Sequence, residues 1–125
     1  MYKMRDNRTL DNPLMVLNLD SFKEQIKHEQ SFIEKNKNSI TIFKSDGMRI
    51  VMIALGKGAE LKTHTAAGVI SVQVLEGEMQ FISGQQSVEL NAGKILALHQ
   101  GIAHSVIASL DTIFLLTLSI PGVKK

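Results

Sequence analysis

The feature that most constrains the fold is a regular series of glycine-bearing turns between short apolar runs, which begins near Ser39. The turns lie at residues 45–47, 56–58, 76–78, 83–85, 91–93 and 100–101. Apolar runs separated by turns about every 8–12 residues are typical of an antiparallel sandwich or barrel. The pattern predicts strands at residues 40–44, 48–55, 69–76, 78–83, 86–90, 94–98, 104–109 and 112–119.

Two of these predicted strands, 48–55 and 112–119, are apolar on both faces. Such a strand has to lie where both of its faces are covered, either by a helix or by a second subunit. If one of them formed the edge of a sheet, a second copy of the chain would cover it. We therefore expect a homodimer.

The N-terminal part of the chain lacks this pattern and favours one short helix. Asp20 or Ser21 is a suitable N-cap. Phe22 and Ile26 lie four residues apart, so they share one face of a helix. We expect a helix near residues 20–30 that is docked by these two side chains.

The 125 residues are enough for one domain with a buried core. The amide-rich and lysine-rich stretch at 35–39 is expected to be a loop between the helix and the strands. We divide the chain into an N-terminal arm with its helix (1–38), a β-barrel (39–120) and a flexible C-terminal tail (121–125).

The composition excludes several classes of protein. There are no cysteines, so a disulfide scaffold, a thiolate metal site and a cysteine nucleophile are excluded. The net charge is only +2, from 14 basic and 12 acidic residues, which argues against nucleic acid and anionic membranes as partners. The longest apolar run, residues 50–55, is far shorter than a membrane span of about 20 residues. No apolar leader follows Met1, so we expect a cytoplasmic protein.

Four histidines carry most of the chemical information, because a neutral imidazole is a metal ligand and a base near neutral pH. His28 falls on the polar side of the predicted helix, where a solvated histidine is expected. His64, His99 and His104 lie among the predicted strands, each near a glycine turn. Three histidines placed in this way in a small β protein indicate a binding site.

The spacing around these histidines resembles two motifs of the cupin superfamily. The first frame has its fixed positions at Gly58, His64, Ala66, Ile70 and Gly77. The second frame has its fixed positions at Gly93, His99, Gly101, His104 and Ala108. The resemblance covers about residues 40–120. It implies an all-β fold, a cupin-like antiparallel β-barrel (jelly roll) with one short N-terminal helix, in a small single-domain protein that is often dimeric.

The resemblance also implies a metal held by two histidines and a glutamate of the first motif and one histidine of the second. His64 and His104 keep the first and last of these positions, whereas Ala66 and Ile70 replace the second histidine and the glutamate. Zinc takes about four ligands, and non-haem iron takes two histidines and a carboxylate. We therefore expect a degenerate site, in which His64 and His104 bind a divalent metal (Zn, Ni, Fe or Mn) weakly or not at all.

Two further polar side chains complete the expected ligand pocket. His99 offers another imidazole nitrogen, and Gln73 offers a carbonyl oxygen. Gln73 lies three residues beyond Ile70, so strand alternation places it on the opposite face unless a bulge intervenes. The expected pocket is lined by His64, Gln73, His99 and His104.

Four functions fit these observations. We favour a barrel that binds a small molecule in its interior, because Ala66 and Ile70 make that interior apolar while the histidines leave a few polar groups. The alternative is a metal-dependent cupin enzyme of the dioxygenase or isomerase type that uses His64 and His104, although the missing carboxylate counts against it. A metal-free acid–base enzyme lacks a visible carboxylate to orient its imidazole. In the fourth function, the barrel is only an assembly module, whose exposed apolar strand pairs two subunits.

Overall fold

The computed structural model describes residues 8–122, which form two helices and nine strands. The helices are α1 (Leu19–His28) and α2 (Gln30–Lys35). The strands are β1 (Lys37–Lys44), β2 (Met48–Leu55), β3 (Glu60–His64), β4 (Ile70–Glu76), β5 (Glu78–Ser83), β6 (Gln86–Asn91), β7 (Ile95–Leu98), β8 (His104–Ala108) and β9 (Thr112–Ser119). The start of the predicted arm (1–7) and most of the predicted tail (123–125) lie outside the described residues. No helix between residues 8 and 122 is long and apolar enough to cross a membrane.

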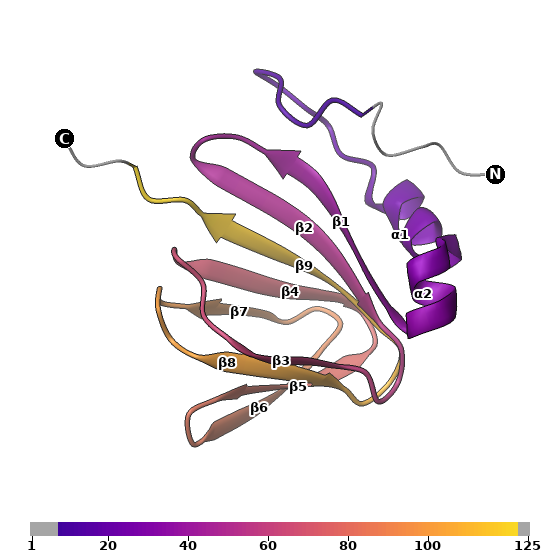
Figure 1. The fold of residues 1–125 in the computed structure, drawn as a ribbon, viewed down its shortest axis with the longest axis vertical. Coiled ribbons are helices and arrows are strands. Elements are labelled where there is room, and N and C mark those ends of the chain that lie inside the picture. Colours follow the sequence, from indigo (N-terminus) through magenta and orange to yellow (C-terminus); the bar gives the residue numbers. More distant parts are fainter. Residues whose placement is uncertain (1–7, 123–125) are drawn as a thin grey trace.

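The strands form two antiparallel sheets that face each other (Figure 1). One sheet has the order β1-β2-β9-β4-β7, and the other has the order β3-β8-β5-β6. The predicted β-rich jelly roll is confirmed in part: two sheets face each other, but they are not closed into a barrel, because no strand of one sheet pairs with a strand of the other within residues 8–122.

Contacts along the outer edge of β1 account for the open gap between the sheets beside β3. The Ser31 hydroxyl donates a hydrogen bond to the carbonyl of Lys37 at 2.9 Å, and the guanidinium of Arg8 donates one to the carbonyl of Thr41. Further along, the amide of Lys44 donates to the carbonyl of Leu10 at 3.0 Å. These contacts occupy backbone groups that a neighbouring strand would need.

The helices pack on the outer face of the five-stranded sheet (Figure 1). Ile26 of α1 is fully buried there, against Met52 and Ala54 of β2 and Ile113 of β9. Both β2 and β9 are interior strands of this sheet. A helix rather than a second subunit therefore covers the two strands that are apolar on both faces, and neither of them forms an edge.

The helical segment differs in detail from the predicted single helix. Asn18, not Asp20 or Ser21, is the N-cap, and its side-chain oxygen accepts a hydrogen bond from the amide of Ser21 at 3.2 Å. Glu29 adopts an extended conformation and divides the segment into two helices. The predicted docking by Phe22 and Ile26 is confirmed.

The predicted loop at residues 35–39 is wrong, because β1 already begins at Lys37. Asn36 is the one residue between α2 and β1, and it has a positive φ of 62°. A short polar side chain tolerates this left-handed conformation better than most residues do. A single residue therefore replaces the expected loop.

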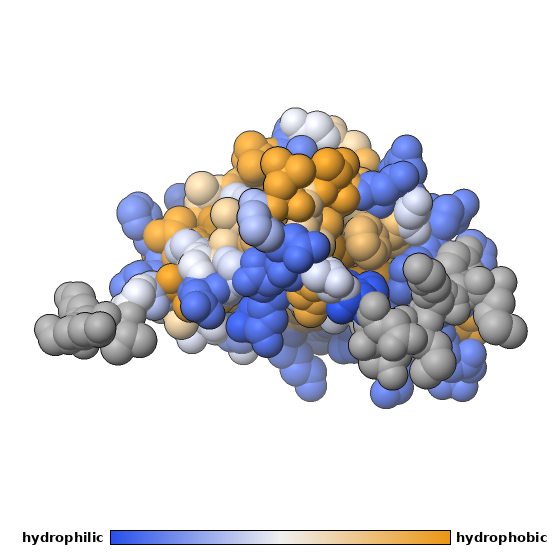
Figure 2. Space-filling view, turned by 90° about the horizontal axis from the view of Figure 1, so that it is seen from above, coloured by the Kyte–Doolittle hydropathy of each residue, from blue (hydrophilic) through white to orange (hydrophobic). Residues whose placement is uncertain are grey.

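Apolar side chains also reach the surface. Figure 2 shows them gathered among hydrophilic residues on the face seen from above. In the segment before α1, the side chains of Leu14 and Val16 are 82% and 90% exposed. Ile95 on the edge strand β7 is 65% exposed.

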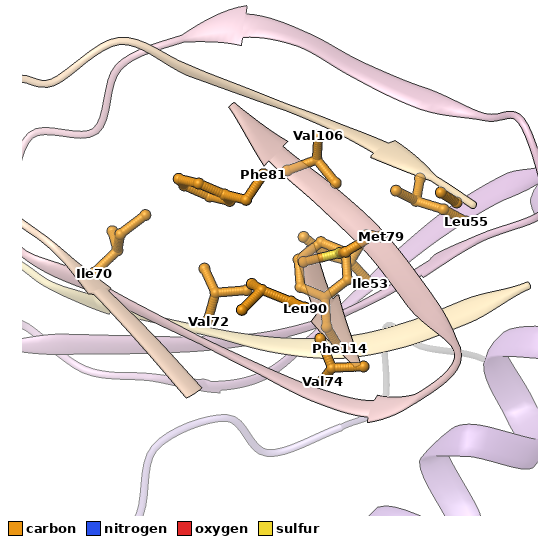
Figure 3. Close-up of a cluster of buried hydrophobic side chains, with 11 residues drawn as sticks. Ile53, Leu55, Ile70, Val72, Val74, Met79, Phe81, Leu90, Val106 and Phe114 are labelled. Atoms are coloured by element: carbon orange, nitrogen blue, oxygen red, sulfur yellow. The ribbon is translucent and has the colours of Figure 1, made fainter. Parts of the chain in front are cut away.

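The main core fills the space between the sheets (Figure 3). Val72 and Val74 of β4, Phe114 of β9, Phe81 of β5 and Val106 of β8 point into it from both sides. Because side chains alternate along a strand, His104 shares the inward face of β8 with Val106. The core thus leads directly to one of the predicted site residues.

Candidate functional site

The histidine pair at the end of β3 and the start of β8 is the candidate site. His64 is the last residue of β3, and His104 is the first residue of β8. The two residues are register partners, and their ring centroids lie 4.3 Å apart with an angle of 61° between the ring planes. The structure therefore brings together the two residues that the sequence proposed as metal ligands.

A bulge in β3 sets the direction of His64. Leu61 pairs with Val106 and His64 pairs with His104, so three steps along β3 match only two steps along β8. Without the extra residue, His64 would lie on the face opposite to Leu61, since strand side chains alternate. The bulge turns His64 to the inward face that Leu61 and His104 share.

The two rings differ in their surroundings. His104 is only 5% exposed and stacks on Phe81 of β5, with ring centroids 5.3 Å apart and an angle of 13° between the planes. His64 is exposed. The pair thus extends from Phe81, in the core, to the protein surface. The register of β5 against β8, in which Phe81 pairs with Val106, places the Phe81 ring beside the site.

Both imidazoles are held in the same way by the backbone. The Nδ1 atom of His64 lies 2.7 Å from the carbonyl oxygen of Lys62, and that of His104 lies 2.9 Å from the carbonyl oxygen of Ile102. A carbonyl oxygen can only accept, so each Nδ1 must carry the proton and donate it. In the neutral rings, each Nε2 therefore keeps its lone pair.

Two Nε2 lone pairs side by side can accept hydrogen bonds from a ligand or coordinate a metal ion. Histidines that bind metals are commonly oriented by such Nδ1–H contacts with a carbonyl. Among residues 8–122, however, no group of three or more histidine, aspartate or glutamate side chains is placed to hold a metal ion. The two histidines by themselves form an incomplete ligand set for a metal ion.

The other predicted site residues are not gathered at this pair. Gln73 is exposed on β4, between Val72 and Val74, which face the core. Alternation therefore places Gln73 on the outer face of the sheet, away from the histidines. His99 is exposed in the segment between β7 and β8. His28 is also exposed, on α1, as expected.

The sequence itself matches no protein-family model, and no curated protein matches it. Solved structures do resemble the fold. A protein of unknown function from Streptococcus pyogenes is 22% identical, with a TM-score of 0.73, over 94% of this chain and 99% of that chain. Because 94% of this chain is covered, the match includes at least part of the helical segment.

Several similar structures are cupins. A cupin superfamily protein from Desulfitobacterium hafniense is 18% identical, with a TM-score of 0.68, over 70% of this chain and 81% of that chain. An RmlC-like cupin from Desulfovibrio desulfuricans is 25% identical, with a TM-score of 0.65, over 74% of this chain and 90% of that chain. The resemblance to the cupin superfamily is confirmed at the level of the fold.

Proposed function

We propose that this cupin-fold protein binds a small molecule at the His64–His104 pair and binds metal weakly or not at all. The observation that carries the proposal is that both rings are held through Nδ1 by a backbone carbonyl. Each Nδ1 donates to a backbone carbonyl, so two Nε2 acceptors lie together at the mouth of an apolar core. A few polar groups at the end of an apolar interior are typical of ligand sites.

The second candidate is a metal-dependent enzyme that uses the same pair. The orientation of the imidazoles favours it, because Nδ1–H contacts with carbonyl groups are common among metal-binding histidines. The absence of a carboxylate beside the pair counts against it, within residues 8–122. A bound divalent ion would depend on water for most of its ligands.

We also propose that the protein is cytoplasmic and that it forms a homodimer. The absence of cysteines suits a reducing compartment. The interior position of β2 and β9 removes the original reason for expecting a dimer. The exposed side chains of Leu14, Val16 and Ile95 now support one, because apolar groups of this size are often covered in an assembly.

Protein purified without an affinity tag tests the function, by native mass spectrometry and metal analysis. We expect a bound organic mass that the His64→Ala/His104→Ala double variant loses, while His28→Ala keeps it. A full equivalent of metal in the wild type would instead favour the enzyme. If the double variant retained the same organic mass, the histidine pair would not be the binding site.

Calorimetric titration with zinc tests the metal part separately. We expect weak binding at neutral pH that the double variant abolishes, since two nitrogens form an incomplete shell. Binding should weaken at acid pH, because a protonated imidazole has no lone pair for the metal. Equal heats from the wild type and the double variant would show that the pair is not a metal site.

A further inference from the structure

Two lysine-bearing turns meet at the end of the sandwich opposite the histidine pair. One turn joins α2 to β1 and is flanked by Lys35 and Lys37. The other joins β2 to β3 and carries Lys57. In Figure 1 this is the right-hand end, where α2 approaches the segment that leaves β2. The contact brings residues of like charge together, so it needs a specific cause.

The cause is a close backbone contact at Gly56. The amide of Gly56 donates to the carbonyl of Asn36 at 2.8 Å, and the side-chain amide of Asn36 donates to the carbonyl of Lys57 at 3.4 Å. A Cβ atom on Gly56 would lie 1.7 Å from Oδ1 of Asn36, so a larger residue would displace the Asn36 side chain from its contact with Lys57. The two turns are therefore fixed against each other by the backbone.

A hollow of about 460 Å³ lies between these turns and the start of β3. Its charged side chains are Lys35, Lys37, Lys57, Lys62 and Glu60. Four lysines and one glutamate give the hollow a formal charge of +3, which exceeds the +2 of the whole chain. Cationic side chains thus outnumber anionic ones in this hollow, and a local excess of one sign attracts anions.

The lysines of the hollow are not neutralised by the protein. Within the described part of the chain, none of the four forms an ion pair with a carboxylate. Lys37 reaches across to β3, where its Nζ donates to the carbonyl of Glu60 at 3.5 Å. Four lysines that line one hollow without ion pairs, beside a single glutamate, suit an anionic ligand.

A second hollow, of about 740 Å³, continues from the first and shares Lys35 and Lys37 with it. Its floor is apolar and is formed by Ile53, Leu55 and Leu61, which belong to the core between the sheets or pack against it. Glu29 also lines this hollow, but its carboxylate accepts hydrogen bonds from the side chains of Gln25 and Asn38. A charged rim therefore adjoins an apolar floor.

This place is distinct from the histidine pair. Glu60 begins β3 and His64 ends it, a separation of about 13 Å at about 3.3 Å per residue. None of the residues that line the two hollows is a histidine.

We propose that the joined hollows bind a soluble amphipathic anion, whose phosphate or carboxylate head lies among the four lysines and whose apolar part covers the floor at Ile53, Leu55 and Leu61. The head supplies the counter-charge that the lysines lack within the described residues. The apolar part packs over the partly buried Leu61, beside which Ile53 is 9% exposed and Leu55 is fully buried, and leaves water in doing so.

NMR titration of the full chain with octyl phosphate tests the proposal, with inorganic phosphate and octanol as comparison probes. Octyl phosphate should bind at least about tenfold more tightly than inorganic phosphate, the gain expected from burying as few as two methylene groups. It should also bind more tightly than octanol, and the difference should shrink at high ionic strength.

Lys57→Gln/Lys62→Gln should weaken octyl phosphate about fivefold or more, because two cations that face the head group are lost. Lys44→Gln/Lys94→Gln removes the same charge elsewhere and should change the affinity less than about twofold. His64→Ala should leave the affinity unchanged, so a failure of this proposal and a failure of the proposed function can be told apart.

Three results would overturn the proposal. The first is an absence of octyl phosphate binding, with a dimer in sedimentation that Lys57→Gln/Lys62→Gln dissociates, which would make the hollows an interface with a second copy. The second is equal affinity for octyl phosphate and inorganic phosphate. The third is equal weakening by both double variants, which would indicate a general effect of net charge.

Discussion

Replacing Ile26 with alanine measures how far the helices belong to the folded core. Ile26 is fully buried between α1 and the outer face of the five-stranded sheet. The substitution removes three carbon atoms, worth about 2.4 kcal/mol at about 0.8 kcal/mol each, and leaves a cavity that adds to the loss. We expect the free energy of unfolding to fall by about 3 kcal/mol.

Ile33→Ala is the matched control, because Ile33 is also helical but is 64% exposed. Both substitutions gain the same small helix propensity, so the difference between them isolates burial. Urea unfolding followed by circular dichroism should show a change below about 0.5 kcal/mol for Ile33→Ala. If both variants lost the same stability, α1 would not be part of the cooperative core, and the cover proposed for β2 and β9 would be wrong.

Three other predictions address charge, backbone and assembly. Burial raises the pKa of Glu76, but hydrogen bonds from Lys23 and Lys27 of α1 outweigh it and hold the pKa below its ordinary value. The ion pairs therefore stabilise the fold above the pKa of the unfolded chain, and this stability is lost as the pH falls through the lower folded pKa. Since the Glu76 side chain is 39% exposed, Glu76→Gln should lower the free energy of unfolding by at most about 1 kcal/mol at neutral pH. The variant should also lose less stability than the wild type as the pH falls, and an equal loss in both would contradict this. Gly77→Ala should destabilise the protein by about 2–4 kcal/mol in thermal unfolding, because φ is +92° and the new Cβ would lie 2.1 Å from a backbone oxygen. Gly47→Ala, where no atom lies within 4 Å, should be nearly neutral, and similar losses from both variants would refute the clash. Sedimentation at micromolar concentration should give about twice the chain mass of 13.8 kDa, whereas a single-chain mass would contradict the proposed dimer.

The strands were predictable where the residue pattern is strong. The bounds of β2, β5 and β9 agree with the prediction, because apolar runs between glycine turns define them clearly. The missed strand, β3, has mostly exposed residues and no apolar alternation, so nothing in its composition marks it. Closure of a sheet depends on what lies along its edges, and two of the contacts along β1 come from Arg8 and Leu10, which are distant in sequence.

The candidate site was predictable only in part. The spacing of the two motifs correctly placed His64 beside His104. It did not show the bulge that turns His64 inward, because a bulge changes the register without leaving a residue signature. Nor did it show the meeting of the lysine turns, which depends on the backbone contact between Gly56 and Asn36.

The position of β2 has a consequence for how the chain folds as it is made. β2 is bordered by β1, which precedes it directly, and by β9, whose residues Thr112–Ser119 follow it by more than 50 residues. Until β9 emerges, a run of β-forming apolar residues has one edge without a partner. Pairing so distant in sequence forms slowly, and an unpaired apolar strand is a template for aggregation. The nascent chain is therefore most vulnerable in the interval before β9 pairs with β2.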